Sequence, residues 1–202
     1  MTAYHSVLRS ASFLRALLDL DSRTTARVRA GPCPHCGGRL DLASYPRKPR
    51  GLLPEFEKEF SRRLSLCCAA EGCRKRATPP SVCFFGRRVY FAVSFILLSM
   101  LRHGVTHERE EQLRLELHGW TPADDRTLAR WREWWQHMLP ASPFWRAARG
   151  LLREPVLPAD LPSGLDQSFT GAAADQLTST LKLLAPLSIP SGSSQSGTAM
   201  VL

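Results

Sequence analysis

Apolar residues recur at helical spacing near the start of the chain, between residues 5 and 20. The positions on the apolar side are Val7, Leu8, Ala11, Leu14, Leu17 and Leu18, with Arg9 and Arg15 on the polar side. This segment lacks the basic start, long apolar run and small-residue cleavage site of a signal peptide. We therefore expect an amphipathic helix that docks on the body of the protein rather than on a membrane.

Two later segments, residues 39–45 and 62–68, alternate between apolar and polar positions and predict β-strands. In the second of them Leu64, Leu66 and Cys68 share one face. Between the two segments, residues 46–50 (PRKPR) predict a basic loop that pairs poorly, because proline cannot donate a hydrogen bond. Residues 54–60 predict one or two turns of helix with Pro54 at the first position.

The most apolar run of the chain spans residues 89–101 (VYFAVSFILLSML). It is well short of the roughly 20 residues that a membrane-spanning helix needs. Because this run is hydrophobic on all sides, it predicts a buried central helix, with Gly104 placed to end it.

Residues 106–139 predict two helices joined by a glycine-containing turn. The first helix covers about 108–117, the turn is His118-Gly119-Trp120, and the second helix ends near Leu139. The second helix begins either with a capping box at Thr121 or with Asp124 as its cap. Its apolar face holds Leu128, Trp131, Trp135, Met138 and Leu139, and its opposite face holds Arg126, Ala129, Arg130, Glu133 and His137. This is the arrangement of a helix-turn-helix DNA reader.

The remaining residues predict a short helix over 144–153, a proline-marked linker, a weak helix over 175–185 and a disordered tail from 188 to 202. The fold class that follows is mainly α with a small β zinc ribbon, an α+β protein. Four units are expected: an N-terminal helix (1–29), a zinc ribbon (30–82), a helical domain with the helix-turn-helix (83–154), and a linker with the weak helix and tail (155–202).

Charge is distributed unevenly along the chain. The net charge is +9, and residues 1–154 carry 26 basic and 15 acidic side chains, which leaves the C-terminal part slightly acidic. Most of the basic residues are arginine, whose guanidinium group forms paired hydrogen bonds with phosphates and guanine edges. This imbalance favours a polyanionic partner, although a high-GC genome also raises the arginine content.

The cysteines carry the strongest signal for a site. Cys33 and Cys36 are separated by two residues, and Cys68 and Cys73 by four, which is the ligand spacing of a structural Zn²⁺ ion. The 31-residue spacer between Cys36 and Cys68 requires an inserted hairpin or short helix. Cys67 remains an alternative to Cys68, and disulfides are disfavoured because Cys-x-x-Cys is a poor structural staple. Cys83 is expected to be a buried small residue or a free thiol.

Candidate DNA contacts lie on the second helix of the helix-turn-helix and in the ribbon loops. On the helix, Arg126 and Arg130 are expected to reach guanine edges or phosphates, Ala129 to allow close approach, and Glu133 to accept from cytosine or pair with a neighbouring arginine. In the loops, phosphate contacts are expected from Arg47, Lys48, Arg50, Arg74, Lys75 and Arg76. The competing interpretation is an ordinary amphipathic helix and loops whose charges are solvated.

Four motifs together resemble a known class of protein. They are 33-CPHC-36, 67-CCAAEGC-73 followed by Arg74, 78-TPPS-81 and 126-RTLARWREWW-135. Over residues 31–150 the chain resembles short zinc-ribbon plus helix-turn-helix proteins of bacterial mobile elements. The resemblance implies binding to DNA ends or target sites alongside a transposase or integrase. It departs from a complete transposase, because Asp124, Asp125 and Glu133 are clustered on one helix instead of being spread over a sheet.

The function expected from the sequence is DNA binding with a structural zinc and no enzymatic activity, either with a transposase or integrase or as a transcriptional regulator. A cytoplasmic, nucleoid-associated location follows from that interpretation. Two alternatives stay open: a protein-interaction adaptor that uses the ribbon and the tryptophan-rich helices, and a transposase or nuclease remnant.

Overall fold

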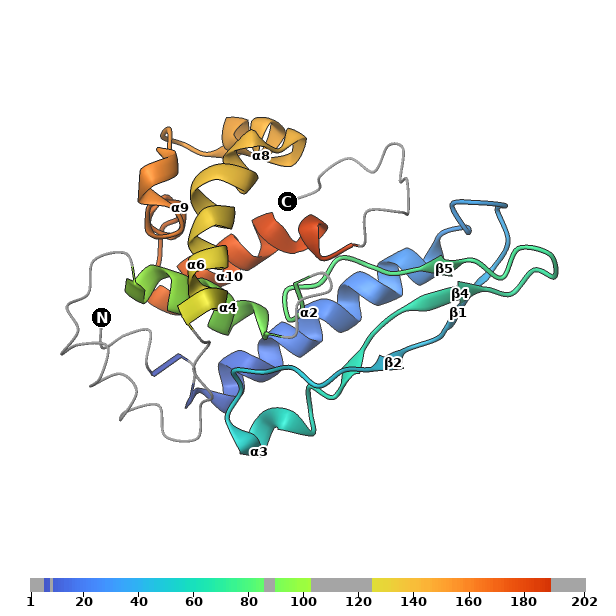
Figure 1. Cartoon of the computed structure of the whole chain (residues 1–202). Helices are drawn as coiled ribbons and strands as arrows, with labels where there is room; N and C mark the ends of the chain where they lie inside the picture. The colour runs from blue at the N-terminus through green and yellow to red at the C-terminus, as the bar shows by residue number, and fades with distance from the viewer. Residues whose placement is uncertain (1–5, 8, 86–89, 103–124, 190–202) are drawn as a thin grey trace.

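The computed structural model of this chain describes residues 6–7, 9–85, 90–102 and 125–189 (Figure 1). Its elements combine helices with two small antiparallel sheets, so the α+β class is confirmed. The first helix of the helix-turn-helix, its glycine turn, both alternative caps and the tail from residue 190 lie outside the described residues.

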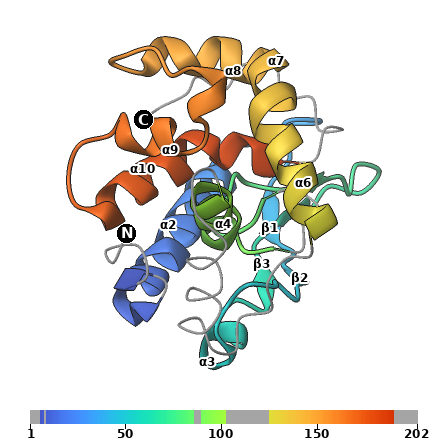
Figure 2. The same cartoon turned by 60° about the vertical axis from the view of Figure 1, so that its left-hand side comes forward.

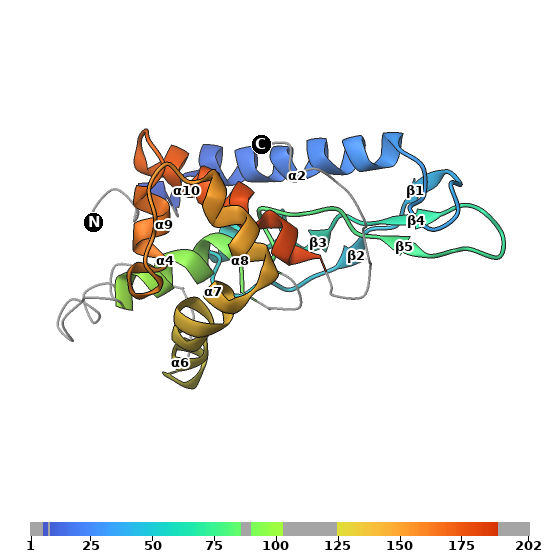
Figure 3. The ribbon, with the colours of Figure 1, turned by 90° about the horizontal axis from the view of Figure 1, so that it is seen from above.

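Helix α2 (Ala11–Ala30) runs from the helical body to the far end of the small sheet (Figures 1 and 3). It begins where the Ser10 hydroxyl accepts a hydrogen bond from the Phe13 N–H at 3.2 Å. The apolar pattern placed this helix over 5–20, but it continues ten residues further. Its buried face extends through Asp21 and Thr25. Because these two residues are polar, a search for apolar residues at helical spacing does not find this part of the helix.

Three short antiparallel ladders form two sheets. Strands β1 (Leu40–Leu42), β4 (Leu66–Cys68) and β5 (Arg76–Ala77) make one sheet in the order β1-β4-β5, and β2 (Tyr45–Pro46) pairs with β3 (Arg62–Arg63). Helix α3 (Pro54–Glu57) lies between β2 and β3 in the chain. The predicted strand over 62–68 is therefore two strands. Strand alternation places Arg63 and Ser65 on the face opposite Leu64 and Leu66, yet both are buried.

The basic segment 46–50 pairs with its neighbours, contrary to the expectation of an unpaired loop. Pro46 lies opposite Arg62, and the Arg47 N–H donates to the Ser61 carbonyl at 2.7 Å. The Arg50 carbonyl accepts from the Phe91 N–H at 2.9 Å. Proline removes only its own donor, so the residues on either side of it still form backbone hydrogen bonds.

The body is built around α4 (Ala92–Arg102), which lies between α6 (Asp125–Glu133) and α10 (Ala173–Leu184) (Figure 2). The central helix predicted over 89–101 is present from Ala92, with Val93, Phe95 and Ile96 fully enclosed, and Gly104, predicted to end it, lies outside the described residues. The smaller elements of the body are a π-helical turn (Trp134–Met138), α7 (Leu139–Ala141), α8 (Pro143–Ala148), α9 (Ser163–Gln167) and three 3₁₀ turns (Arg149–Leu151, Pro158–Asp160, Ala185–Ser188).

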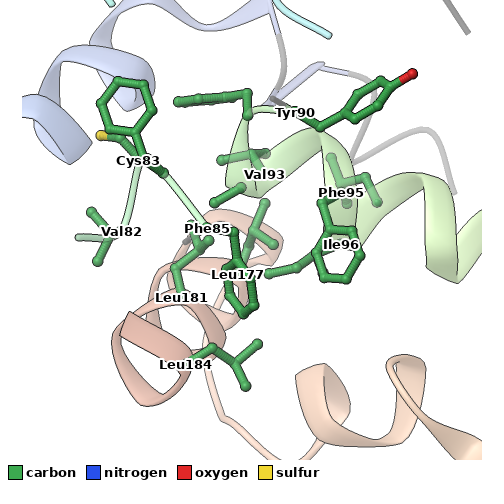
Figure 4. Close-up of a cluster of buried hydrophobic side chains, with 14 of the residues drawn as sticks. Val82, Cys83, Phe85, Tyr90, Val93, Phe95, Ile96, Leu177, Leu181 and Leu184 are labelled. Atoms are coloured by element: carbon green, nitrogen blue, oxygen red, sulfur yellow. The ribbon is translucent and has the colours of Figure 1, made fainter. Parts of the chain in front are cut away.

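The C-terminal helix contributes to the central core. Leu177, Leu181 and Leu184 of α10 lie against the segment that includes Val82 and Phe85 and against α4 (Figure 4). The sequence suggested a weak helix after a linker, because α10 is short and follows three prolines. Its four buried leucines instead make it part of the same apolar cluster as α4.

Candidate metal centre and basic surfaces

Four cysteines meet at the end of an arm that projects from the body. We define the arm as residues 22–46 and 62–77, the C-terminal part of α2 and the strands beside it (Figure 3). The Sγ atoms of Cys33, Cys36, Cys68 and Cys73 all lie within 4.8 Å of one another. Cys36 and Cys68 are 3.4 Å apart at their sulfurs, and Cys33 and Cys73 are 3.9 Å apart. The four residues with the predicted ligand spacing are therefore brought together.

Each pair of cysteines lies on a tight turn that we call a knuckle. The first knuckle, which holds Cys33 and Cys36, starts directly after α2. The Cys33 N–H donates to the Gly38 carbonyl at 2.7 Å, and the Gly37 N–H donates to the Cys33 carbonyl at 2.9 Å, which closes a tight turn. Gly37 has φ +76°, a left-handed conformation that favours glycine. Gly38 passes close to the sulfurs, because a Cβ there would lie 3.1 Å from Cys68 Sγ and 3.4 Å from Cys36 Sγ.

The second knuckle follows β4. The Ala70 N–H points at the Cys68 sulfur at 3.4 Å, and the Cys73 N–H donates to the Ala70 carbonyl at 3.2 Å. Gly72 has φ +82° and Arg74 has φ +45°, so the chain turns sharply on both sides of Cys73. Backbone geometry thus aims both cysteines of this knuckle at the first pair.

Strand pairing sets the distance between the knuckles. Leu40 of β1 lies opposite Cys68 of β4, so the residues that follow the first knuckle are in register with the start of the second. The long spacer is accommodated by the β2–β3 ladder together with α3. The expected insertion is therefore both a hairpin-like pair and a short helix.

Cys67 lies outside the cluster. Its thiol contacts the Arg74 carbonyl at 3.2 Å, and its neighbours across the sheet are Asp41 and Arg76. Adjacent strand residues point to opposite faces, which explains why Cys68 and not Cys67 reaches the other sulfurs. Cys83 is fully buried and free, as expected, and burial raises the pKa of its thiol.

The donor set fits a soft tetrahedral metal ion. Zinc–sulfur bonds of about 2.3 Å in tetrahedral geometry require sulfur–sulfur distances of about 3.8 Å. The two measured separations, 3.4 and 3.9 Å, lie on either side of that value. The backbone N–H of His35 lowers the pKa of the Cys33 thiol to about 7, toward the thiolate form that binds metals, whereas burial and the neighbouring thiols raise the pKa values of Cys68 and Cys73. His35 itself is exposed.

The predicted ribbon contacts fall into two groups. Arg74 and Lys75 are exposed in the second knuckle beside the cysteines. Arg76 is exposed too, but its guanidinium group is engaged within the arm, where it donates to the Ala43 carbonyl and lies 5.4 Å from the Tyr45 ring centroid. Within the segment that contains Arg47, Lys48 and Arg50, the last residue pairs with residues 90–91, which directly precede α4. The segment therefore lies at the base of the arm and not beside the knuckles.

Helix α6 and the π-helical turn after it present the residues predicted for the polar face to solvent. Arg126, Ala129, Arg130, Glu133 and His137 are all exposed. The opposite face packs on α4, where the Trp131 ring lies 4.9 Å from Phe95 edge to face, and Trp135 stacks on Phe95 at 5.3 Å. Arg130 donates to the Thr127 hydroxyl at 3.0 Å.

Met138 was expected on the buried face and is 61% exposed. The π-helical turn over Trp134–Met138 adds a residue to one turn and rotates the helix that follows. Leu139, predicted on the same face, is buried as expected. A wheel drawn with constant α-helical spacing cannot anticipate this shift.

A buried polar network at the base of the arm was not predicted. Asp21 of α2 accepts hydrogen bonds from the Ser81 hydroxyl and, at 2.8 Å, from the Val82 N–H. Arg63 of β3 donates to the Pro79 carbonyl and to the Ser188 hydroxyl. Burial raises the pKa of Asp21 and lowers that of Arg63. The signal available in the sequence was a lone aspartate in register with Leu14 and Leu17.

Within the described ranges, none of the helices combines the length and the apolar character needed to cross a membrane. Comparisons with protein-family models, curated proteins and solved structures found no match.

Proposed function

We propose that the four thiolates bind one structural zinc ion and that the exposed basic side chains bind duplex DNA. The observation that carries the proposal is the gathering of four sulfurs within 4.8 Å beside the exposed Arg74 and Lys75. Neither of these two side chains forms a salt bridge with the residues that the structure describes.

The chemistry of the donors supports zinc. Four sulfurs suit a soft ion, whereas Ca²⁺ and Mg²⁺ require oxygen ligands. When bound, zinc would supply a cross-link between the two knuckles. Four protein ligands leave no open position for water or substrate, so the proposed role of the metal is structural and not catalytic.

The charge distribution and the anchoring of α6 support DNA binding. The tryptophans on the buried face fix the helix on the body, and the opposite face leaves Arg126 and Arg130 one turn apart in solvent. Such a pair suits guanine edges or phosphates, and Ala129 between them permits close approach. Glu133 lies 3.8 Å from His137, so it is placed either to pair locally or to accept from cytosine. The knuckle residues would add phosphate contacts.

The proposed biological role is binding without catalysis, together with a transposase or integrase or at a regulated promoter. In this role the helix-turn-helix would select the DNA site and the metal-supported arm would strengthen the complex. The partner enzyme would supply any strand cleavage.

Metal analysis and a salt series of duplex binding test the proposal together. We expect one zinc per chain, and binding that weakens steeply as salt rises because phosphate contacts release counterions. The double variant Arg126→Ala/Arg130→Ala should weaken binding. Each lost phosphate contact should reduce the slope of the logarithm of the binding constant against the logarithm of the salt concentration by about 0.9.

The matched control is Arg15→Ala/Arg23→Ala, which removes the same charge. These two exposed arginines already pair with Glu59 and Asp19. Equal weakening of DNA binding by both double variants would mean that only the net charge of the protein matters, and it would contradict a role for α6. A protein with zinc but no affinity for DNA would contradict the DNA assignment.

A further inference from the structure

A groove runs between α2 and the strands of the arm. Its volume is about 520 Å³. Helix α2 contributes one wall and the strand side contributes two leucines, so the lining includes Thr25, Ala26, Arg29, Ala30, Leu42 and Leu64. Ala26 and Ala30 are exposed and four residues apart, which lets a docked chain approach the helix closely.

Leu42 is the unusual member of this lining. It is 56% exposed, although it lies in strand β1 two residues from the fully enclosed Leu40. Because it lies in a concave surface, this side chain can be covered by an apolar group of a ligand.

The charge in the groove has one sign. Arg29 is the only charged side chain in the lining, and it forms no salt bridge with the described part of the chain. Among the described residues, no carboxylate lines the groove. A ligand for this surface therefore needs an apolar group for Leu42 and a carboxylate for Arg29.

We propose that this groove docks a short acidic, amphipathic segment of a partner protein. The proposal goes beyond DNA binding and does not depend on it. A second copy of this chain fits less well, because the lining offers Arg29 no acidic counterpart in a symmetric contact. A nucleic acid fits less well too, because phosphates gain nothing from the leucine and alanine side chains.

The position of the groove links docking to the metal. Ala30 is the last residue of α2, and only Gly31 and Pro32 separate it from Cys33. On the strand side, Leu42 belongs to the strand that pairs with the one ending at Cys68. Both walls are therefore attached to metal ligands, and removal of the metal should abolish docking.

Selection from a displayed library of short random peptides, with the zinc-loaded full chain as bait, tests the proposal. We expect enrichment of peptides that combine an apolar residue with Asp or Glu. Their affinity should fall roughly tenfold or more for Leu42→Asp, as for the loss of a binding hot spot. Leu157→Asp, which changes a leucine of the body that is 63% exposed, is the matched control. Arg29→Glu should reverse the selected charge and enrich Lys and Arg.

Four outcomes would overturn the proposal. One is that no selected peptide binds Leu42→Asp and Leu157→Asp with different affinity. Another is that the peptides selected with Arg29→Glu carry the same charge as those selected with the native chain. If sedimentation shows a dimer and Leu42→Asp dissociates it, the groove would be assigned to contact with a second copy of the chain. Weaker duplex binding by Leu42→Asp would assign it to DNA. Metal content and thermal unfolding of the variants establish that each is folded, and duplex affinity reports separately on the DNA-binding proposal.

Discussion

The arm and the body are stabilised in different ways. The body encloses many large side chains, among them Trp135, Phe91 and Phe95. The buried cluster of the arm has five members: Cys33, Leu40, Leu66, Cys68 and Ala77. Two of these five are thiol-bearing candidate ligands, so the arm has little hydrophobic stabilisation without a cross-link. A segment of this size generally needs a metal or disulfides to fold.

The largest expected effect comes from breaking the metal centre. Cys73→Ser should remove the bound metal and unfold the arm, because metal binding contributes on the order of 10 kcal/mol to the folding of small zinc modules. Hydrogen exchange should show lost protection in β1, β4 and β5 and retained protection in α4 and α10. Metal content measures the first effect and exchange mass spectrometry the second.

The control for that variant is Cys67→Ser, which changes the same side chain six residues earlier and outside the cluster. It should leave the metal content at the native value. Equal loss of protection in the arm and the body after Cys73→Ser would show that the two regions unfold as one unit and would remove the contrast between them.

The body should respond to the loss of an aromatic side chain and not to the loss of metal. Trp135 is fully buried and stacks on Phe95. Trp135→Ala should lower the free energy of unfolding by about 3–5 kcal/mol through the cavity that it leaves. Denaturant titration measures this change, and the bound metal should remain. Met138→Ala should change the unfolding free energy by less than about 0.5 kcal/mol, because Met138 is exposed. Similar losses for both variants would contradict the assignment of the π-helical turn.

The metal ligands could be predicted from the sequence because coordination geometry requires short, characteristic gaps between ligands along the chain. Cys33, Cys36, Cys68 and Cys73 follow from short gaps in the chain, and strand alternation favoured Cys68 over Cys67. The central helix could be predicted for a similar reason, since a continuous apolar run has few alternatives. Both signals are contained within one element or one turn.

The features that sequence reasoning missed depend on partners far apart in the chain. Asp21 is buried because Ser81 and Val82, about 60 residues away, supply its hydrogen bonds. Ser188 contacts Arg63 from 125 residues away. The helix propensity of α10 revealed nothing of its burial, which depends on the apolar surface that α4 and residues 82–85 offer to it. No local pattern contains this information.

The buried network joins the two regions and gives the smallest of the three expected effects. Asp21→Ala should cost about 1–3 kcal/mol of unfolding free energy, because the Ser81 hydroxyl and the Val82 N–H lose their acceptor in a buried site. Asp21→Asn keeps one acceptor oxygen and should cost less. Asp19→Asn, on the exposed side of the same helix, is the control and should cost no more than about 0.5 kcal/mol.

The difference in unfolding free energy between the native protein and Asp21→Asn should depend on pH, which sharpens this prediction. Burial raises the pKa of Asp21 above its ordinary value of 3.8, so the folded state favours the protonated carboxyl. The stability that Asp21 contributes is then fully present below pH 3.8 and is lost as the pH rises through the raised pKa. The unfolding free energy of the native protein minus that of the Asn variant should accordingly decrease over this range, as measured by denaturant titration at successive pH values. An increase would mean that the Ser81 and Val82 hydrogen bonds and the charge of Arg63 outweigh burial and hold Asp21 as a carboxylate. In that case the junction would be a buried ion pair, and a charge interaction would couple the arm to the body.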